Sequence, residues 1–177
     1  MKFIKPFYIQ SRFFYACITL MVLFVLSFVF PRWFVIVKLL FLVLLIFTLL
    51  DVLLLFTAKR GINGIRILPE KFSNGDQNPI RLSIENYYTF PIFIKIIDEI
   101  PVQFQVRNFN IERKLDATSK TELQYKLRPT ERGEYHFGKL NMYATSVFGL
   151  IARRFSFCDD AMVPTYPSFI QLRKYNL

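Results

Sequence analysis

The chain has 177 residues, 53% of them hydrophobic, with 23 Lys and Arg against 13 Asp and Glu, a formal net charge of +10 at pH 7. This composition excludes intrinsic disorder and a collagen-like fibre, and two cysteines are too few for a disulfide-rich secreted scaffold. A basic chain favours nucleic acid or anionic lipid as a partner, whereas a strongly apolar chain favours a membrane protein. Residues 1–57 contain five basic residues and one acidic residue, a net charge of +4. Residues 58–177 contain 18 basic and 12 acidic residues, a net charge of +6.

Two long apolar runs follow a short basic N-terminal segment. Residues 13–30 contain no charge and, as a helix, extend over about 27 Å, close to the hydrocarbon thickness of a bilayer. A proline then interrupts the helix, and residues 34–57 form a second apolar run. We therefore predict a transmembrane helical hairpin over residues 13–57, with Trp33 as an anchor at the membrane interface.

Two alternatives to a transmembrane hairpin remain open. A cleaved signal peptide also combines a basic start with an apolar body, but no small-residue cleavage site follows and a second apolar run comes at once. A buried hairpin in a soluble protein is less favoured, because unbroken apolar runs of this length are rare in soluble cores.

The charges at the ends of the hairpin predict its orientation. Most of the positive charge lies at the two open ends, in the basic segment (residues 1–12) and directly after the second run: Lys2, Lys5, Arg12, Lys59 and Arg60, with Arg66 further on. The turn carries Arg32, and Lys38 lies one helical turn into the second run. By the positive-inside rule, both ends of the hairpin are expected in the cytoplasm, in a multi-pass membrane protein.

Asp51 is an acid inside the second predicted span, where a charge is costly. Folding the hairpin about Arg32 places Asp51 opposite Phe13 and next to Arg12. We therefore predict an intramembrane Arg12–Asp51 ion pair between the two helices. A proton or ion site and simple exposure near the interface are the alternatives.

The remaining residues change from continuous apolar to alternating sequence. We divide them into a juxtamembrane linker with the first strand (58–67), a cytoplasmic β-sandwich domain (68–166) and a C-terminal tail (167–177) that is expected to begin a missing domain. Strands are predicted at residues 65–68, 80–85, 92–98, 102–107 and 121–128. In the last of these, apolar and polar residues alternate with the period of a half-buried strand. About seven strands at this spacing predict an all-β, immunoglobulin-like sandwich.

A local pattern around Tyr135 supports this fold class. Residues 131–137 resemble the stretch of immunoglobulin domains in which a tyrosine hydroxyl bonds back to the preceding corner. After Phe137 the positions expected to face inward change from odd-numbered to even-numbered residues, which predicts a β-bulge at Gly138.

The chain shows no catalytic, cofactor-binding or metal-binding constellation. Cys17 is placed in the first span and Cys158 in the domain, so no disulfide between them is predicted. The single histidine, His136, is expected to face solvent on a strand, and Asp159-Asp160 to form a turn. The scattered basic pairs accompany no nucleic-acid motif, so nucleic acid is not predicted as a partner.

Three short motifs lie in the last third of the chain. They contain Gly133, Tyr135 and Gly138 (RG-Y-FG), Phe148, Gly149 and Leu150 (FGL), and Tyr166 and Pro167 (YP). Together with the hairpin, they resemble the N-terminal part of the bacterial family called "domain of unknown function 58". The resemblance implies a location in the bacterial inner membrane and a role as a partner of a MoxR-type AAA+ ATPase in assembly or maturation. It also implies that the family's defining C-terminal segment, within a domain similar to von Willebrand factor type A, is lacking here.

We therefore predict a membrane-anchored, non-enzymatic interaction or assembly module whose partners are the lipid bilayer and a protein. Exposed sheet edges and the aromatic residues Tyr87, Tyr88 and Phe90 are the predicted contacts, with core packing as the alternative for those aromatics. The alternative function is a membrane-embedded accessory subunit of a transport or envelope complex, whose hairpin carries the contact. A membrane-bound enzyme is the least favoured prediction, and no small-molecule substrate is evident.

Overall fold

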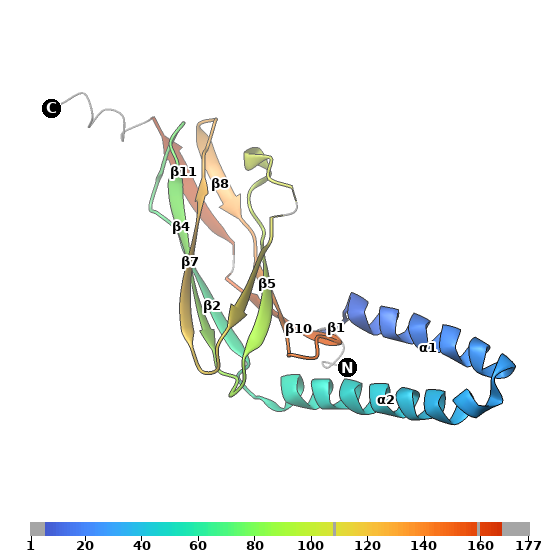
Figure 1. Cartoon of the computed structure of the whole chain (residues 1–177). Coiled ribbons are helices and arrows are strands. Elements are labelled where there is room, and N and C mark those ends of the chain that lie inside the picture. The colour runs from blue at the N-terminus through green and yellow to red at the C-terminus, as the bar shows by residue number, and fades with distance from the viewer. Residues whose placement is uncertain (1–5, 108, 159, 168–177) are drawn as a thin grey trace.

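A computed structural model describes residues 6–107, 109–158 and 160–167, and contains two apolar helices followed by a β-sandwich (Figure 1). Helix α1 spans Ser11–Val29, a 3₁₀ turn covers Pro31–Trp33, and helix α2 spans Phe34–Thr57. Both helices are long and apolar enough to cross a membrane. Figure 1 shows them extending from one end of the sandwich, whose long axis runs across them.

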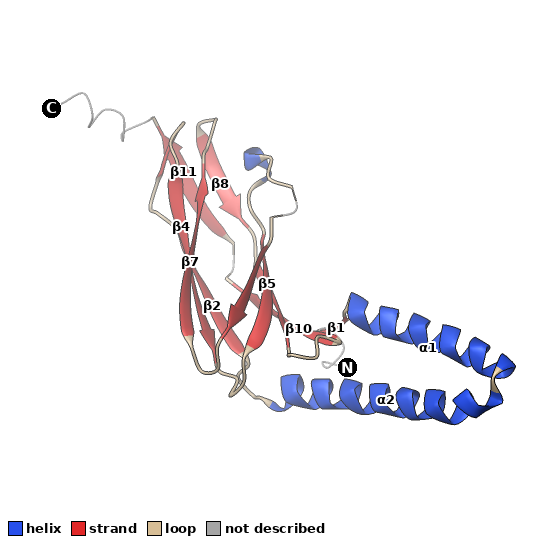
Figure 2. Cartoon of the chain, viewed as in Figure 1, coloured by secondary structure: helices blue, strands red, loops and turns tan. Residues whose placement is uncertain are grey.

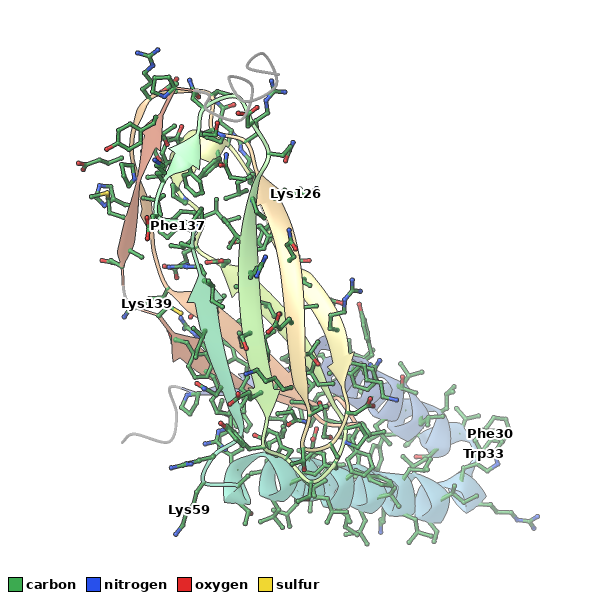
Figure 3. The ribbon with its side chains drawn as sticks, turned by 90° about the vertical axis from the view of Figure 1, so that its left-hand side faces the viewer. Phe30, Trp33, Lys59, Lys126, Phe137 and Lys139 are labelled. Carbon is green, nitrogen blue, oxygen red and sulfur yellow. The ribbon has the colours of Figure 1, made fainter. Side chains whose placement is uncertain are left out.

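Most large apolar side chains of the two helices are exposed around their whole circumference. Trp33 lies at the tip of the pair, together with Phe30 (Figure 3). In α2 the buried residues are Val37, Asp51 and Leu55, and the last two lie at the end of the helix that meets the sandwich. The helices therefore leave most of their apolar surface exposed. They bury Asp51 and Leu55 at the end that meets the domain, and Val37 and Ser27 near the opposite end.

The sandwich is built from antiparallel strands (Figure 2). In chain order they are β1 (Phe7–Ile9), β2 (Ile62–Ile67), β3 (Phe72–Ser73), β4 (Asn78–Asn86), β5 (Ile92–Asp98), β6 (Ile111–Leu115), β7 (Lys120–Leu127), β8 (Gly133–Phe137), β9 (Leu140–Thr145), β10 (Ile151–Phe157) and β11 (Ala161–Tyr166). One sheet has the order β1-β10-β9-β5-β6, a second β2-β4-β7, and a third β3-β11-β8. Among the strands of the described residues, only the β3–β11 pair is parallel.

Two apolar clusters fill the sandwich. The larger lies near the helices and combines inward residues of β4, β5 and β9 with Leu55 of α2. The smaller, around Phe72, Tyr135 and Phe137, lies under the third sheet. The predicted fold class, an apolar helical pair followed by an all-β, immunoglobulin-like sandwich, is confirmed.

The chain changes sheets at Gly138 and Lys139, which separate β8 from β9. The buried positions shift there from Tyr135 and Phe137 to even-numbered residues beginning at Leu140. The Gly138 amide donates to the Glu99 carbonyl at 2.9 Å, so the break remains hydrogen-bonded. The interruption lets one stretch of chain serve two sheets, which is the usual consequence of a break in the pleat.

Four of the predicted strands overlap β2, β4, β5 and β7, but the strand predicted at residues 102–107 was wrong. Val102–Phe104 form a 3₁₀ turn, and Gln105 adopts a left-handed φ of 52°. The preceding Pro101 offers no amide to a strand ladder, and a left-handed residue ends extended pairing. The short β1 was not predicted, since three residues are too few for an alternating pattern.

Candidate functional site

Asp51 of α2 is fully buried where the helix meets the loop between β9 and β10. Ser146 Oγ donates a hydrogen bond to its Oδ1. The amides of Leu150 and Ile151 each donate to its Oδ2 at 2.9 Å. We call these four residues the joint cluster, because they connect the helices to the sandwich. Three donors converge on one carboxylate, which offsets the cost of burying its charge.

The FGL motif forms the loop that approaches Asp51. Gly149 has a φ of +64°, a conformation that side chains disfavour, and this turn directs the two following amides toward the carboxylate. A Cβ added to Gly149 would also lie 2.9 Å from the Arg12 guanidinium. The Phe148 ring packs against Phe47 of α2, with 5.1 Å between centroids. The motif therefore docks the sandwich on α2.

The structure does not bring Arg12 and Asp51 together as the predicted ion pair. Among the described residues, no nitrogen of Arg12 lies within 4.0 Å of an Asp51 oxygen. Arg12 is exposed beside Gly149, while Asp51 faces the donors of the joint cluster. The buried acid did require partners, but a hydroxyl and two backbone amides supply them instead of a guanidinium.

The C-terminal end of α2 is held by two side chains of the sandwich. The Leu55 carbonyl accepts hydrogen bonds from Tyr88 Oη at 2.9 Å and from Arg153 Nη1 at 2.6 Å. Arg153 also donates to the Ala58 carbonyl at 2.9 Å, and its guanidinium lies over the Phe155 ring. A cation at the negative end of the helix dipole satisfies carbonyls that have no partner within the helix.

The start of α1 is fixed to the same strand. β1 pairs with β10, where Tyr8 lies opposite Ala152. The Gln10 amide donates to the Leu150 carbonyl at 3.0 Å, and Arg154 donates to Tyr8 Oη at 3.1 Å. Because both ends of the hairpin are bonded to β10 or the loop before it, the sandwich cannot swivel freely on its helices.

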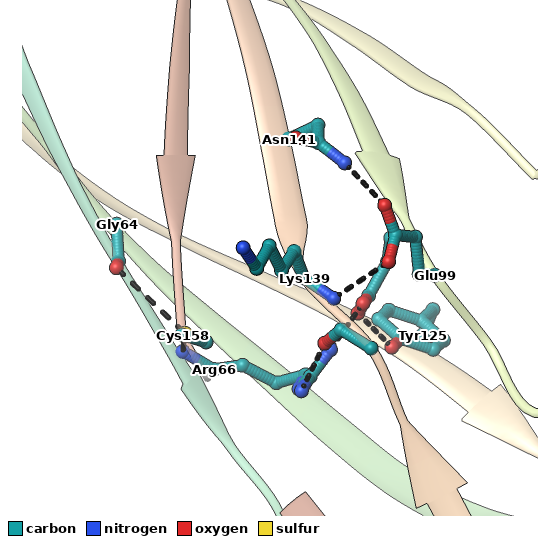
Figure 4. A network of polar contacts seen from close by, with 9 residues as sticks. Gly64, Arg66, Glu99, Tyr125, Lys139, Asn141 and Cys158 are labelled. Carbon is teal, nitrogen blue, oxygen red and sulfur yellow. Dashed lines mark hydrogen bonds and ion pairs between the residues drawn. The ribbon is translucent and has the colours of Figure 1, made fainter. Parts of the chain in front are cut away.

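A second polar cluster lies between the sheets, away from the helices (Figure 4). Arg66 of β2 pairs with Asp98 of β5, and Tyr125 Oη of β7 donates to Asp98 Oδ2 at 2.5 Å. The side chains of Arg66 and Asp98 are 1% and 0% exposed. We call these three residues the core cluster. Arg66 was grouped with the charges flanking the membrane; the structure instead buries it, because its position on β2 faces inward.

Burial dominates the titration of the core cluster. It raises the pKa of the Asp98 carboxyl, against the opposing effects of the Tyr125 hydrogen bond and the Arg66 charge. Burial and the adjacent Asp98 charge together raise the pKa of the Tyr125 phenol. Arg66 Nη2 also donates to the Gly138 carbonyl at 2.9 Å, so the cluster secures the point where the chain changes sheets.

The other predicted residues lie apart from the joint cluster. Tyr135 Oη donates to the Glu131 carbonyl at 3.0 Å, which is the geometry of a tyrosine corner. His136 is exposed, and Cys17 and Cys158 are free thiols in α1 and after β10. Tyr166 is exposed at the end of β11. Lys2, Lys5 and Asp159 lie outside the described residues.

Of the three aromatics predicted as partner contacts, only Tyr87 is exposed. Tyr88 is buried against Leu55, and Phe90 is partly buried beside it, with 5.0 Å between their ring centroids. Both residues follow the end of β4 at Asn86, where the Tyr88 hydroxyl reaches the Leu55 carbonyl and Tyr87 Oη donates to Glu85 at the surface. Ser146 and Arg153 were not predicted as site residues, and Tyr88 was predicted as a partner contact but instead donates to the Leu55 carbonyl. The buried Asp51, which needs donors, was the signal that pointed to such a site.

Within the described part of the chain, no group of three His, Cys, Asp or Glu side chains is arranged to hold a metal ion. An apolar groove of about 400 Å³ lies between α1 and α2. A pocket of about 560 Å³ lies beside Lys59 and Arg60, where α2 passes into β2. Figure 3 shows Lys59 projecting from this end of α2.

No protein-family model and no curated protein matches the sequence. Among solved structures, the chain is similar to the seventh PapD-like (ASH) domain of human CEP192, with 11% identity and a TM-score of 0.46 over 62% of this chain and 87% of that one. It is also similar to the CARDB domain of a Pyrococcus furiosus protein. The solution structure gives 10% identity and a TM-score of 0.38, covering 59% of this chain and 93% of that one. The crystal structure of that domain in complex with di-metal ions gives 9% identity and a TM-score of 0.39, covering 60% of this chain and 93% of that one. Similarity at this level does not bear on function.

Proposed function

We propose that this protein is a membrane-anchored, non-enzymatic interaction or assembly module of the bacterial inner membrane, which presents its sandwich to a protein partner in the cytoplasm. The joint cluster is the observation that carries the proposal. It binds the head to the helices through a buried carboxylate, so a surface on the head has a fixed orientation relative to the anchor.

The position of Asp51 supports a membrane anchor of suitable length. The part of α2 before it, residues 34–50, extends over about 25 Å, close to the hydrocarbon core of a bilayer. Asp51 then lies at the edge of the bilayer, where the sandwich covers it. Arg12, Lys59 and Arg60 lie at the same end of the hairpin as the sandwich, so the positive-inside rule favours a cytoplasmic head.

The outer face of β2 offers a contact for a protein partner. Ile65 and Ile67 are 53% and 49% exposed, and because they are two residues apart they lie on the same face of the strand. Exposed apolar residues beside a strand edge are common in recognition by strand addition. The motifs shared with the "domain of unknown function 58" family favour a MoxR-type AAA+ ATPase as the partner.

The groove between the helices favours a second candidate function, an accessory subunit whose hairpin carries the contact. It is lined by apolar side chains and two small polar ones: Phe13, Cys17, Phe41, Leu44, Leu45, Thr48, Leu49 and Val52. A helix of another membrane subunit would bury this surface by close packing.

Two variants of the full chain distinguish these functions. The chain is purified in detergent with a MoxR-type ATPase from the same bacterium, and the retained ATPase is measured. We expect Ile65→Asp with Ile67→Asp to abolish retention and Leu45→Trp, which fills the groove, to leave it unchanged. The reverse result supports the accessory-subunit function, and loss in neither variant contradicts a contact through β2.

Cysteine labelling in spheroplasts tests the membrane location separately. In a chain with both native cysteines replaced by Ser, we expect Trp33→Cys to react with an impermeant maleimide from outside. We expect Lys126→Cys, in the sandwich, to react only after permeabilisation. Equal labelling of the two positions from outside would contradict a cytoplasmic head.

A further inference from the structure

A pocket of about 480 Å³ lies in the corner between the first turn of α1 and the outer face of the five-stranded sheet. Its walls come from residues 10–12 and from β5, β6 and β9. Figure 1 shows that the long axis of the sandwich runs across the helices. This face of the sheet is therefore on the same side of the sandwich as α1. We call this space the corner pocket. Its volume is in the range of pockets that bind small ligands.

The corner pocket is basic. Four basic residues of α1, β5 and β6 line it: Arg12, Lys95, Arg113 and Lys114. Glu112 contributes a carboxylate that lies 3.6 Å from Lys95 Nζ. Arg12 and Lys114 make no hydrogen bond or ion pair with any described residue, so their charges are available to a ligand. Phe93, opposite Lys114 in the sheet register, is 45% exposed on the same face.

The start of α1 adds to this positive potential. The helix has 19 residues, no acid in its first turn, and no side-chain cap from Gln10. The amides at a helix N-terminus carry a partial positive charge, which a nearby anion stabilises. Lys95 and Glu112 pair with each other. The corner therefore combines the unpaired charges of Arg12 and Lys114 with the positive end of a long helix.

The position of the corner pocket relative to the proposed membrane indicates which anion can reach it. Arg12 directly precedes the uncharged run that we place in the bilayer, so the pocket lies at the level of the lipid headgroups. A second basic pocket, beside Lys59 and Arg60, lies at the other open end of the hairpin. At this level a phosphate bears the negative charge and the exposed Phe93 ring meets the less polar part of the lipid.

We propose that the corner pocket binds the phosphate of an anionic phospholipid, with Arg12 and Lys114 contacting the headgroup and Phe93 lying against its glycerol region. The proposal rests on the membrane location proposed above. It extends that function, because a bound lipid at the joint would add a direct contact between the fixed head and the membrane surface, whose strength depends on the charge of that surface.

The test uses the full chain in a neutral detergent, titrated with three probes: dioctanoyl-phosphatidylglycerol, dioctanoyl-phosphatidylcholine and inorganic phosphate. We expect phosphatidylglycerol to bind most tightly. Arg12→Gln with Lys114→Gln is expected to weaken its binding by about 30-fold, since each surface cation contributes about fivefold. The matched control, Lys126→Gln with Lys139→Gln, removes two exposed charges far from the corner and is expected to bind as the wild type does (Figure 3).

The outcomes separate the sources of the phosphate. Equal affinity for inorganic phosphate and phosphatidylglycerol would overturn a lipid site and indicate a free-anion site. Equal loss in the corner and control variants would overturn the pocket. Should the double variant fail to fold, Lys114→Glu alone changes an exposed strand position and carries the same expectation. Because binding is measured in detergent and orientation in spheroplasts, failure of this proposal is distinguishable from failure of the membrane topology.

Discussion

The two buried carboxylates, Asp51 and Asp98, are stabilised in different ways. Asp51 lies between two parts of the protein and accepts hydrogen bonds from a serine hydroxyl and two backbone amides. Asp98 lies within the sandwich and pairs with the Arg66 guanidinium and the Tyr125 phenol. The first contact places the loop backbone on the helix, whereas the second connects side chains of two sheets.

This difference predicts where each acid matters. Two backbone amides can donate hydrogen bonds to one carboxylate only if the loop adopts a particular conformation. Asp51 therefore specifies how the loop after Ser146 docks on α2. A pair of full charges in a dry core is costly to separate, so Asp98 bears mainly on the stability of the sandwich. Five predictions test this comparison, beginning with the largest expected effect.

Breaking the Arg66–Asp98 pair should destabilise the protein most. Asp98→Ala leaves the guanidinium buried without its carboxylate, and we expect the free energy of unfolding to fall by about 3–5 kcal/mol. Denaturant unfolding of the full chain in detergent measures this.

The double variant Arg66→Met with Asp98→Leu is the control for the core cluster. It replaces both charges with apolar side chains, and we expect it to recover most of the lost stability, because desolvation of the charges is then no longer required. A single variant as stable as the wild type would mean that the pair is not desolvated.

Removing Asp51 should loosen the joint and leave the sandwich folded. In Asp51→Ala the amides of Leu150 and Ile151 lose their acceptor, at a cost of about 1–3 kcal/mol. We expect faster hydrogen exchange at these two amides, with unchanged exchange in β4 and β7.

The variant Arg12→Ala decides between the observed cluster and the ion pair predicted from the sequence. Because Arg12 does not contact Asp51, we expect wild-type exchange at Leu150 and Ile151. If this variant loosened the loop as much as Asp51→Ala does, the two residues would be paired after all.

Alkaline pH should destabilise the core cluster through Tyr125. An unfolded tyrosine loses its proton near pH 10, whereas burial and the Asp98 charge raise the pKa of Tyr125 in the folded protein. Above pH 10 the folded state therefore binds more protons, and the free energy of unfolding falls as pH rises, by about 1.4 kcal/mol per pH unit from this group. Unfolding curves between pH 10 and 11 should be less steeply pH-dependent in Tyr125→Phe; equal slopes in the two proteins would rule out this contribution.

The stability lost with a hydrogen bond between neutral groups provides a reference for the stability lost with the charged ones. Tyr135→Phe removes the bond that the hydroxyl donates to the Glu131 carbonyl at 3.0 Å and the longer one that it accepts from the Glu131 amide at 3.4 Å, and we expect a loss of about 1 kcal/mol in denaturant unfolding. A loss as large as that of Asp98→Ala would show that charge does not account for the difference between the clusters.

Local patterns predicted much of the fold. The two apolar helices and the alternating residues of β7 follow from periodicity within one segment, so no distant contact is needed to identify them. The segment at 102–107 has a strand-like composition, but Pro101 and the left-handed Gln105 prevent pairing. Arg66 was misplaced because its charge was considered along the chain and not across the sandwich, where Asp98 lies opposite.

The candidate site was only partly predictable. A carboxylate in an apolar helix signals the need for a partner, and that expectation directed attention to Asp51. Its donors lie 95 to 100 residues away in the sequence, beyond any pattern within the hairpin. The FGL motif was recognised by resemblance, but only the fold shows that its glycine lets the backbone bind α2.

The pairing of β1 with β10 has a consequence for biosynthesis. β1 leaves the ribosome first, and its partner, residues 151–153, follows after both helices and most of the domain. The helical pair is therefore synthesised with its first end untethered, and β1 pairs with β10 only late in synthesis. A bulky fusion placed before Phe7 would stand at the edge where this pairing occurs.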